Sequence, residues 1–309
     1  LSYNDLPKND YVDSFVIADC LRFGRINKEV YLDDYRYAAL KNLTRARFFA
    51  VQNLTREKQR FMNHLFKKYS TMAQEKVFSD TFSTTALAVY ESFESAEALA
   101  NMDLHQLTEF IIEKGKKRFP DPDSVAKAIQ KAARSSYRLP KTVNDSVNQV
   151  LSISISSMRA MESQIKAFDK AIAEQMALIP NTLTSVNGIG PVYSAGIIAE
   201  IGDINRFPNQ ASLAKYAGLV WSQHQSGDFE AQNTRMIQSG NRYLKYYLCE
   251  AALSLVRCDA EYRSFYHRKY KEVNKYQHKR ALALTARKFV RLVFRLLKDN
   301  CLYRAPESK

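Results

Sequence analysis

The sequence predicts a mainly α-helical protein of about two or three domains. Apolar residues recur at intervals of three and four over most of the chain, which is the spacing of one helix face, and little of the chain alternates as a strand would. In two blocks basic residues interleave with the apolar ones, so those helices have one apolar and one cationic side. At 46% apolar content the chain can bury a sizeable core, which excludes a disordered protein.

The N-terminal half divides into helices of different length. A first helix follows a short polar loop and ends near Gly24, and a long one runs from about 32 to 69. Residues 79–140 contain shorter helical patterns, interrupted where two prolines restrict the residues before them and Asp123 can cap the next helix. We therefore expect a compact helical insert between two long helices.

The second long helix is predicted over 143–179, where apolar residues keep mostly alternating three- and four-residue steps, the seam of a coiled coil. Ser154 interrupts this seam, and Pro180 ends it. A single exposed stripe of that length would aggregate, so we expect the helix to pair with the earlier basic one or with a second subunit. From Gly240 the tail is helical again, and any sheet is small.

A glycine turn precedes a further helix that runs to Gly202. Gly188 and Gly190 flank Ile189, and Pro191 follows at a position where a helix needs no N–H donor. This is a helix-hairpin-helix pattern, whose backbone N–H groups and positive helix end can hold a phosphate without reading a base. A purely structural turn remains the alternative.

Charge points to a polyanionic partner. The net charge is +14 with a pI near 9.5. Residues 231–309 carry 18 Lys and Arg against 6 Asp and Glu, and residues 36–68 carry 9 against 1. No apolar run approaches the ~20 residues that cross a bilayer, and the four cysteines lack Cys-x-x-Cys spacing, as expected of reduced cytosolic thiols. The candidate DNA contacts are Gly188, Ile189, Gly190, Arg235, Arg242 and Lys245.

Two carboxylates open the first helix. Asp10 and Asp13 are three residues apart, which puts them on one helix face, where two hard oxygen ligands can share a Mg²⁺. The alternative is ordinary capping, in which acidic side chains stabilise the helix N-terminus.

A serine in a polar loop is the candidate nucleophile. Ser226 precedes Gly227, which leaves room for a phosphate backbone, and His224 is the nearest base that could activate the hydroxyl. An ordinary Ser-Gly turn is the alternative. Farther on, aromatic and basic residues mix over 262–271, where the aromatics could stack unpaired bases, although Tyr262 is expected to lie in the core.

These segments, in this order, resemble one known family. The run Lys8 to Ser14 resembles the Lys-Thr-Asp-x-x-Asp-Ala element that supplies the last two acids of a RuvC-like Asp-Glu-Asp-Asp metal site, with mild departures at Asn9 and Ser14. The turn and helix of 186–202, the Tyr-Ala-Gly-Leu of 216–219 and the Ser226-Gly227 step resemble the family's C-terminal domain. Over nearly its whole length the chain resembles a transposase of the IS one-ten family of insertion sequences, in the eleven-eleven subgroup.

The resemblance implies a DNA transposase with three parts. They are the C-terminal remnant of a RuvC-like (RNase H-like) domain at 1–31, a coiled-coil arm at 32–180 with its insert at 79–140, and a helical transposase domain with the helix-hairpin-helix at 181–309. Asp10 and Asp13 would bind Mg²⁺, and Ser226 would attack DNA and hold it as a phosphoserine.

The same resemblance implies partners and a location. The site would combine the RuvC-like domain of one subunit with the serine domain of another, so we expect a homo-oligomer, a dimer or a tetramer. The partners would be the insertion-sequence ends, the target DNA and a structured noncoding RNA. The protein would work in a bacterial or archaeal cytoplasm, at the nucleoid.

One departure and two alternatives remain. The family's first Asp and its Glu lie upstream of the matching region, and the sequence opens at Leu1, so we expect an N-terminally truncated chain that is inactive in strand cleavage alone. A helix-hairpin-helix DNA glycosylase would need a catalytic Asp in a Val-Asp step, which Asp203-Ile204 does not fit. A noncatalytic DNA- or RNA-binding remnant of a transposase stays open.

Overall fold

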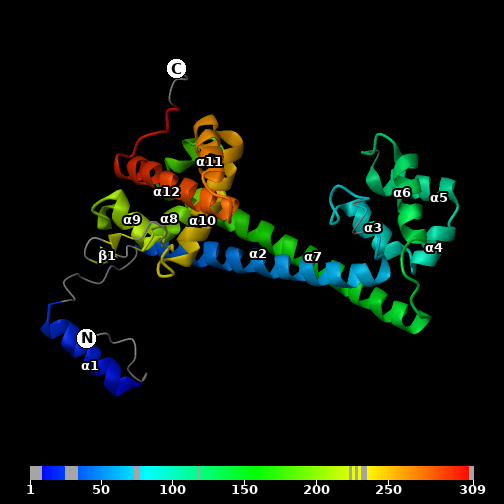
Figure 1. The fold of residues 1–309 in the computed structure, drawn as a ribbon, viewed down its shortest axis with the longest axis horizontal. Helices are drawn as coiled ribbons and strands as arrows, with labels where there is room; N and C mark the ends of the chain where they lie inside the picture. The colour runs from blue at the N-terminus through cyan, green and yellow to red at the C-terminus, as the bar shows by residue number, and fades with distance from the viewer. Residues whose placement is uncertain are drawn as a thin grey trace.

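The computed structural model shows two globular bodies joined by a long helical arm (Figure 1). It describes residues 9–24, 34–72, 75, 77–116, 118–222, 225–226, 229–230 and 235–305. The arm consists of α2 (Tyr35–Lys68) and α7 (Lys141–Met176), which lie side by side. The predicted mainly helical class is confirmed. The strands described are β1 (Gln225–Ser226) and β2 (Phe229–Glu230), of two residues each.

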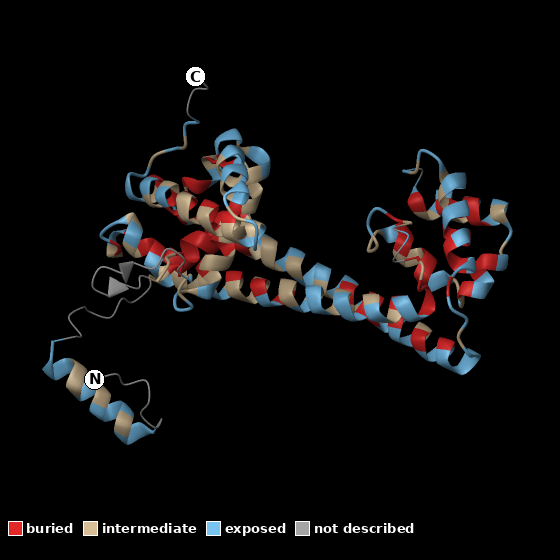
Figure 2. Ribbon diagram, in the orientation of Figure 1, coloured by how far each residue is buried: buried red, intermediate tan, exposed pale blue. Residues whose placement is uncertain are grey.

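The arm is an antiparallel helix pair within one chain, so α7 has the earlier basic helix as its partner (Figure 1). Ser154, predicted to interrupt the apolar seam, is buried and donates a hydrogen bond of 2.6 Å to the carboxylate of Glu57 across the pair. No residue is buried in the middle of the arm, over 51–60 of α2 and 159–171 of α7 (Figure 2). Each body therefore has its own core.

The insert forms the body at the far end of the arm. Its helices are α3 (Thr84–Ser92), α4 (Ala96–Asn101), α5 (Leu104–Gly115) and α6 (Pro122–Arg134). They enclose a hydrophobic core with the adjoining ends of α2 and α7. The largest buried side chains there are those of Phe61, Leu65, Tyr69, Tyr90, Leu99, Leu107, Ile111, Ile129 and Leu151.

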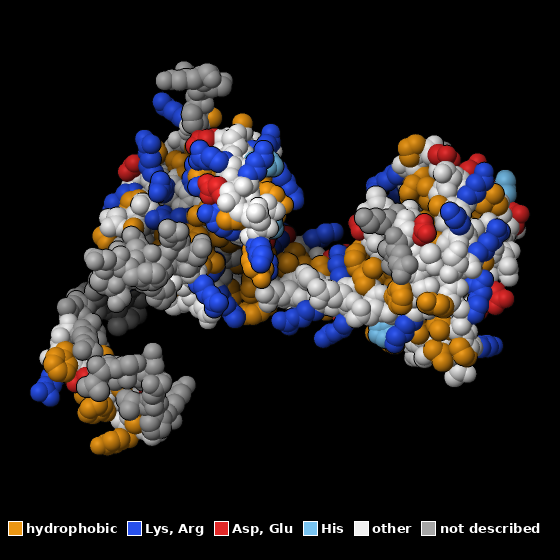
Figure 3. Space-filling view, in the orientation of Figure 1, with side chains coloured by type: hydrophobic (Ala, Val, Ile, Leu, Met, Phe, Trp, Pro, Cys, Tyr) orange, Lys and Arg blue, Asp and Glu red, His pale blue; other side chains and the backbone are white. Residues whose placement is uncertain are grey.

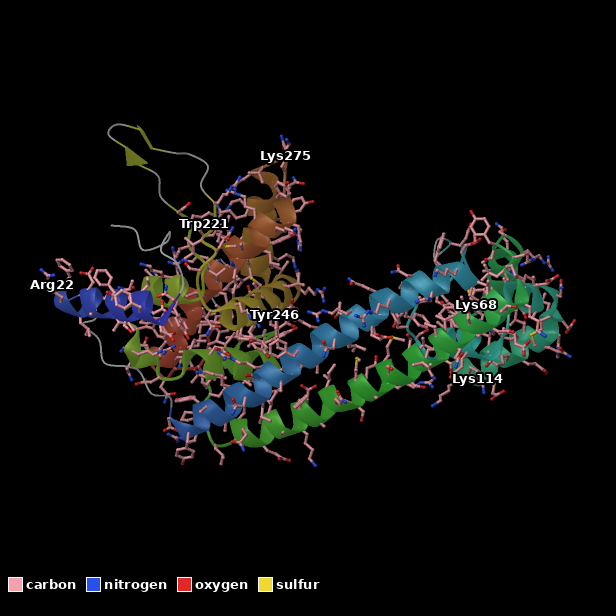
Figure 4. All side chains as sticks on the ribbon, turned by 90° about the horizontal axis from the view of Figure 1, so that it is seen from below. Arg22, Lys68, Lys114, Trp221, Tyr246 and Lys275 are labelled. Carbon is pink, nitrogen blue, oxygen red and sulfur yellow. The ribbon has the colours of Figure 1, made fainter. Side chains whose placement is uncertain are left out.

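Two polar contacts fix details of the insert. The cap of α6 is Asp121, which accepts a hydrogen bond of 3.0 Å from the N–H of Ser124, so the prediction that Asp123 caps this helix is wrong. Asp123 lies in the first turn and accepts instead from the hydroxyl of Thr108. At the end of α2, buried Lys68 (labelled in Figure 4) donates to the carbonyl of Tyr90 at 2.8 Å, and burial lowers the pKa of its ammonium to about 8.

The second body surrounds α8 (Pro191–Ile201), whose residues from Ser194 onward are all buried. Against it packs α10 (Arg242–Cys258), while α12 (Gln277–Lys298) packs on α10 and on α9 (Gln210–Tyr216), and α11 (Ala260–Lys271) covers α10 and α12 (Figure 1). Two short 3₁₀ segments, η2 (Leu183–Ser185) and η3 (Ile204–Arg206), flank α8 in the chain. The first half of α2 also packs on α8, which ties the arm to this core.

The helix α1 (Asp10–Arg22) stands apart from this body in Figure 1, at the lower left, and has no buried residue. Asn9 caps it by accepting a hydrogen bond of 2.9 Å from the N–H of Val12. Its apolar side chains Tyr11, Phe15 and Leu21 are exposed. Among the described residues, no helix is long and apolar enough to cross a membrane.

Candidate active site and nucleic-acid interface

The segment between α9 and α10, which contains Ser226, starts and ends at two touching glycines. Gly218 and Gly240 both have positive φ, of 69° and 120°. A Cβ on Gly218 would lie 2.6 Å from the carbonyl oxygen of Ser239, and one on Gly240 would lie 2.6 Å from the nitrogen of Gly218. No other residue fits either position without backbone movement. The N–H of Asn241 also donates to the carbonyl of Tyr216 at 2.7 Å.

From this base the chain runs out and back as a hairpin. Ile237 donates its N–H to the carbonyl of Val220 at 3.0 Å, and Ser222 donates its N–H to the carbonyl of Arg235 at 2.9 Å. Trp221, labelled in Figure 4, pairs with Met236 between these bonds. We call residues 219–239 the serine hairpin.

Ser226 lies in the outer part of the serine hairpin. The strands β1 and β2 pair antiparallel, with Ser226 opposite Phe229, so only Gly227 and Asp228 separate the paired residues in sequence. The side chain of Ser226, and His224 and Gly227 as a whole, lie outside what the structure describes. The backbone nevertheless places the candidate serine at the turn end of a hairpin, and Figure 4 shows this end beyond the helices.

A buried carboxylate ties the base of the hairpin to the arm. Glu200, near the end of α8, is fully buried and receives two hydrogen bonds of 2.7 and 2.8 Å from the guanidinium of Arg45 on α2. The side-chain amide of Asn241 donates a third hydrogen bond, of 2.7 Å, to the same carboxylate. The same amide also donates a hydrogen bond of 3.1 Å to the hydroxyl of Tyr216. The hydrogen bonds that Arg45 donates to Glu200 raise the pKa of the Arg45 guanidinium, which therefore stays charged.

Asn241 has a second role at this junction. Its side-chain oxygen accepts hydrogen bonds of 3.0 Å from the N–H groups of both Tyr243 and Leu244, so it is the N-cap of α10. Arg45 lies over the ring of Tyr243 at 4.4 Å. One asparagine thus joins the start of α10 to the buried carboxylate and to the end of α9.

In the predicted helix-hairpin-helix turn, the backbone requires a glycine at one of the two glycine positions. Gly188 has φ of 89°, and a Cβ there would lie 2.9 Å from the Cβ of Cys258. Gly190 has an ordinary φ of −77°, is exposed, and is the N-cap of α8 with open space around a built Cβ. Ile189 is buried and its N–H already donates to Val186 at 2.9 Å, so it offers a phosphate neither side chain nor N–H. Gly188 and Gly190 remain the candidate contacts of this turn.

The three predicted cations lie near the hairpin base in sequence but in different settings. Arg235, on the returning part of the hairpin, is exposed. Arg242 is exposed at the start of α10, donates to the hydroxyl of Tyr243, and lies 4.7 Å from that ring and 5.7 Å from the ring of Phe49. Lys245, one turn later, is half-buried. Figure 3 shows many further Lys and Arg side chains on this body and along the arm.

Asp10 and Asp13 are both exposed in the first turn of α1. Two carboxylates provide only part of a magnesium coordination shell. The described residues contain no group of three or more His, Cys, Asp and Glu side chains that could hold a metal ion. Within the described part of the chain, the two acids therefore do not form a complete metal site, and α1 does not bring them into packed contact with the body.

Sequence reasoning missed the buried network of Glu200, Arg45 and Asn241. A weak signal was present, because Glu200 is the one charged residue in an otherwise apolar and small-residue helix. Its partner Arg45 is 155 residues away in sequence, so no local pattern could identify it. A better signal was the Gly240-Asn241 step, since glycine followed by asparagine before an apolar helix marks a turn and a cap.

Both halves of this candidate site match known family models. Residues 181–267, which contain the glycine turn and the serine hairpin, match the model described as the transposase IS116/IS110/IS902 family. Residues 2–69, which contain α1 and α2, match the model of the DEDD transposase of IS110 elements. The chain belongs to the IS110/IS116/IS902 family of transposases. Transposases of this kind act on DNA, so the chain is a DNA-recombining enzyme by family.

Individual relatives agree with this assignment. An uncharacterized 44.8 kDa protein of insertion element IS116 from Streptomyces clavuligerus is 26% identical over 98% of this chain and 74% of its own length. An uncharacterized 43.6 kDa protein of insertion element IS110 from Streptomyces coelicolor is 32% identical over 47% of this chain and 34% of its own length. A probable family 20 transposase from Pseudomonas aeruginosa is 31% identical over 32% of this chain and 28% of its own length.

Proposed function

We propose that this transposase cuts and exchanges DNA strands with Ser226 as its nucleophile. The serine Oγ attacks a backbone phosphorus and forms a phosphoserine ester, while one P–O bond of the DNA breaks and leaves a free hydroxyl on the other DNA end. The Oγ proton passes to a base, for which His224 is the nearest candidate in sequence. Attack by a DNA hydroxyl on the phosphoserine then restores the serine and joins the strands.

The support for Ser226 as the nucleophile is its position in the fold. It sits at the turn end of a hairpin whose base is fixed by touching glycines and by the Asn241 contacts to Glu200 and Tyr216. A nucleophile that attacks a phosphodiester must be held in a fixed position and must have open space for the DNA. The single observation that carries the proposal is this placement of Ser226 within residues that match the transposase family.

We extend the proposal to Mg²⁺ and the two acids of α1. Asp10 and Asp13 supply two of the oxygen ligands, and further acids complete the shell. When bound, the metal supplies positive charge against the phosphate oxygens. The support is the exposure of both carboxylates on one helix face and the match of residues 2–69 to the DEDD transposase model. The exposed apolar side chains of α1 fit the same idea, because a helix of a RuvC-like domain packs on a sheet.

The remaining parts of the proposal concern assembly and partners. We propose that the acids of one subunit meet the serine hairpin of another in a dimer or tetramer, since α1 carries the acids without any buried contact to the body of its own chain. Gly188 and Gly190 hold a DNA phosphate at the helix-hairpin-helix turn, and Arg235, Arg242 and Lys245 flank the cleaved strand. A structured noncoding RNA binds the basic helices and selects the DNA.

Covalent trapping tests the central step. The complete gene product is incubated with Mg²⁺ and labelled DNA that contains an insertion-sequence end, and the products are separated on a denaturing protein gel. We expect a protein-linked DNA band that disappears in Ser226→Ala and persists in the control Ser222→Ala, a serine of the same hairpin. Cleavage that survives Ser226→Ala would refute the serine mechanism. DNA binding without any covalent product in the wild type would favour a noncatalytic nucleic-acid-binding protein.

A further inference from the structure

A groove with a volume of about 720 Å³ opens in the C-terminal body, away from the serine hairpin in sequence. It lies between α11, α12 and the tail that follows α12, and α12 and the tail are outside the residues that the two family models match. Its wall combines rings, aliphatic side chains and guanidinium groups. The members used below are Glu261, Arg291, Arg295, Cys301, Tyr303 and Arg304.

The tail is fastened along one side of this groove by a single tyrosine. The backbone N–H of Tyr303 donates to the hydroxyl of Ser185 at 2.9 Å, and its own hydroxyl donates to the carboxylate of Asp259 at 3.1 Å. Burial and the neighbouring Asp259 raise the pKa of Tyr303 to about 12, so the hydroxyl remains a donor. The half-buried ring is therefore held at a fixed place in the groove wall.

The positive charge of α12 at the groove is only partly balanced, since Arg295 pairs with Asp299 at 3.8 Å. Arg287, Arg291 and Arg295 follow one another at four-residue steps, so like charges face each other along the helix, which is unfavourable in a free helix. The groove's acid, Glu261, pairs with Lys288 at 2.5 Å. In the part of the chain that the structure describes, neither Arg291 nor Arg304 has an ion-pair partner.

We propose that this groove binds a single-stranded nucleic-acid segment, with an unpaired base against Tyr303 and its phosphates on Arg291 and Arg304. Aromatic rings beside cations are the means by which proteins hold single strands without reading sequence. A volume of several hundred Å³ has room for a base and its sugar. A duplex keeps its bases stacked inside, so it cannot use the ring. The site requires neither Ser226 nor the acids of α1, so it stands apart from the strand-cleavage chemistry.

Binding of short labelled oligonucleotides to the whole chain tests the groove. Twelve-nucleotide RNA, single-stranded DNA and duplex DNA are compared by fluorescence anisotropy, and the tighter single strand identifies the natural ligand. Tyr303→Leu should weaken single-strand binding roughly 5- to 150-fold, the range for loss of one base stack. Tyr303→Phe keeps the ring and should retain most of the binding even though it loses the hydrogen bond to Asp259.

The two arginines have a separate signature in salt dependence. The double variant Arg291→Gln/Arg304→Gln should reduce the slope of log affinity against log salt by about 1.4, or about 0.7 for each phosphate contact on a single strand. The control double variant Lys131→Gln/Arg134→Gln removes the same charge from exposed positions on α6 and should leave the slope unchanged. Equal effects of the two double variants would mean that total charge, not the groove, governs binding and would overturn the proposal.

A footprint on unmutated protein locates the ligand independently of any folding effect. Cys301 lies in the groove wall, whereas Cys20 lies on α1. A saturating four-nucleotide single strand should slow alkylation of Cys301 by iodoacetamide and leave Cys20 unaffected, as read by mass spectrometry. The Ser226→Ala chain should show the same protection, so failure of the serine mechanism would not affect this result. Unchanged Cys301 alkylation in the presence of bound oligonucleotide would refute the site.

Discussion

The base of the serine hairpin and the helix α1 carry the two halves of one proposed site, but the chain supports them very differently. At the hairpin base, two glycine backbones touch, and fully buried Glu200 accepts hydrogen bonds from Arg45 and Asn241. On α1 no residue is buried, and the side chain of Tyr11 is 83% exposed. Contacts within the folded body fix the position of the hairpin base. No buried contact fixes the position of Asp10 and Asp13 on α1.

This difference separates two kinds of positioning. The base of the serine hairpin is held in place by hydrogen bonds that join α2, α8, α9 and α10, so these contacts form whenever the body folds. The acids of α1 have no such support in the described residues, because no residue of that helix is buried. A site divided in this way would become active on assembly, which agrees with the proposed pairing of acids and serine from different subunits.

The largest effect is expected at the glycine contact. Gly240→Ala should destabilise the chain by about 2–4 kcal/mol, because it adds a Cβ where φ is 120° and where the nitrogen of Gly218 lies 2.6 Å away. The matched control is Gly190→Ala, whose φ is ordinary and whose Cβ meets nothing within 4 Å. Urea denaturation followed by circular dichroism measures both. Equal midpoints for the two variants would show that the hairpin base is not a tight contact.

The same contrast shows what the sequence could predict. Helix spacing predicted the two long helices and the insert, and the Gly188 to Pro191 run predicted a turn before α8, because these signals are local. The approach of Gly218 to Gly240 depends on two residues separated by the whole serine hairpin. Nothing near either glycine in the sequence indicates that the other backbone lies against it.

Prediction of the candidate site was limited in the same way. Asp10, Asp13 and Ser226 were identified by resemblance to a family, since an acid pair or a Ser-Gly step alone occurs in many helix caps and turns. The bond between Glu200 and Arg45 spans 155 residues and could not be inferred from either neighbourhood. The sequence could not predict the buried contacts that hold the base of the serine hairpin in place.

An intermediate effect is expected where the arm meets the hairpin base. Arg45→Met leaves the fully buried Glu200 without its charged partner, so stability should fall by about 2 kcal/mol. This is less than for a fully buried pair, because the side chain of Arg45 is 38% exposed and water screens it. Thermal or urea denaturation measures the loss, and the double variant Arg45→Met/Glu200→Met should lose less than the sum of the two single variants.

An exposed ion pair serves as the control for this experiment. Arg36 pairs with Asp34 near the start of α2, and both side chains are more than a third exposed. Arg36→Met should leave the unfolding midpoint unchanged. If Arg36→Met and Arg45→Met shift the midpoint equally, the buried network contributes nothing beyond an ordinary surface pair, and the contrast with α1 becomes much weaker.

The smallest effect on folding, and the most informative about function, is expected on α1. Asp10→Asn and Asp13→Asn should leave the unfolding midpoint where it is, since both carboxylates are exposed and no buried contact depends on them. If they hold Mg²⁺, each substitution should nevertheless reduce DNA cleavage by the complete gene product to background, with DNA binding retained. Glu174→Gln removes one exposed carboxylate from α7 and is the matched control for both measurements. Wild-type cleavage in the two aspartate variants would leave these acids only the role of stabilising the start of a helix.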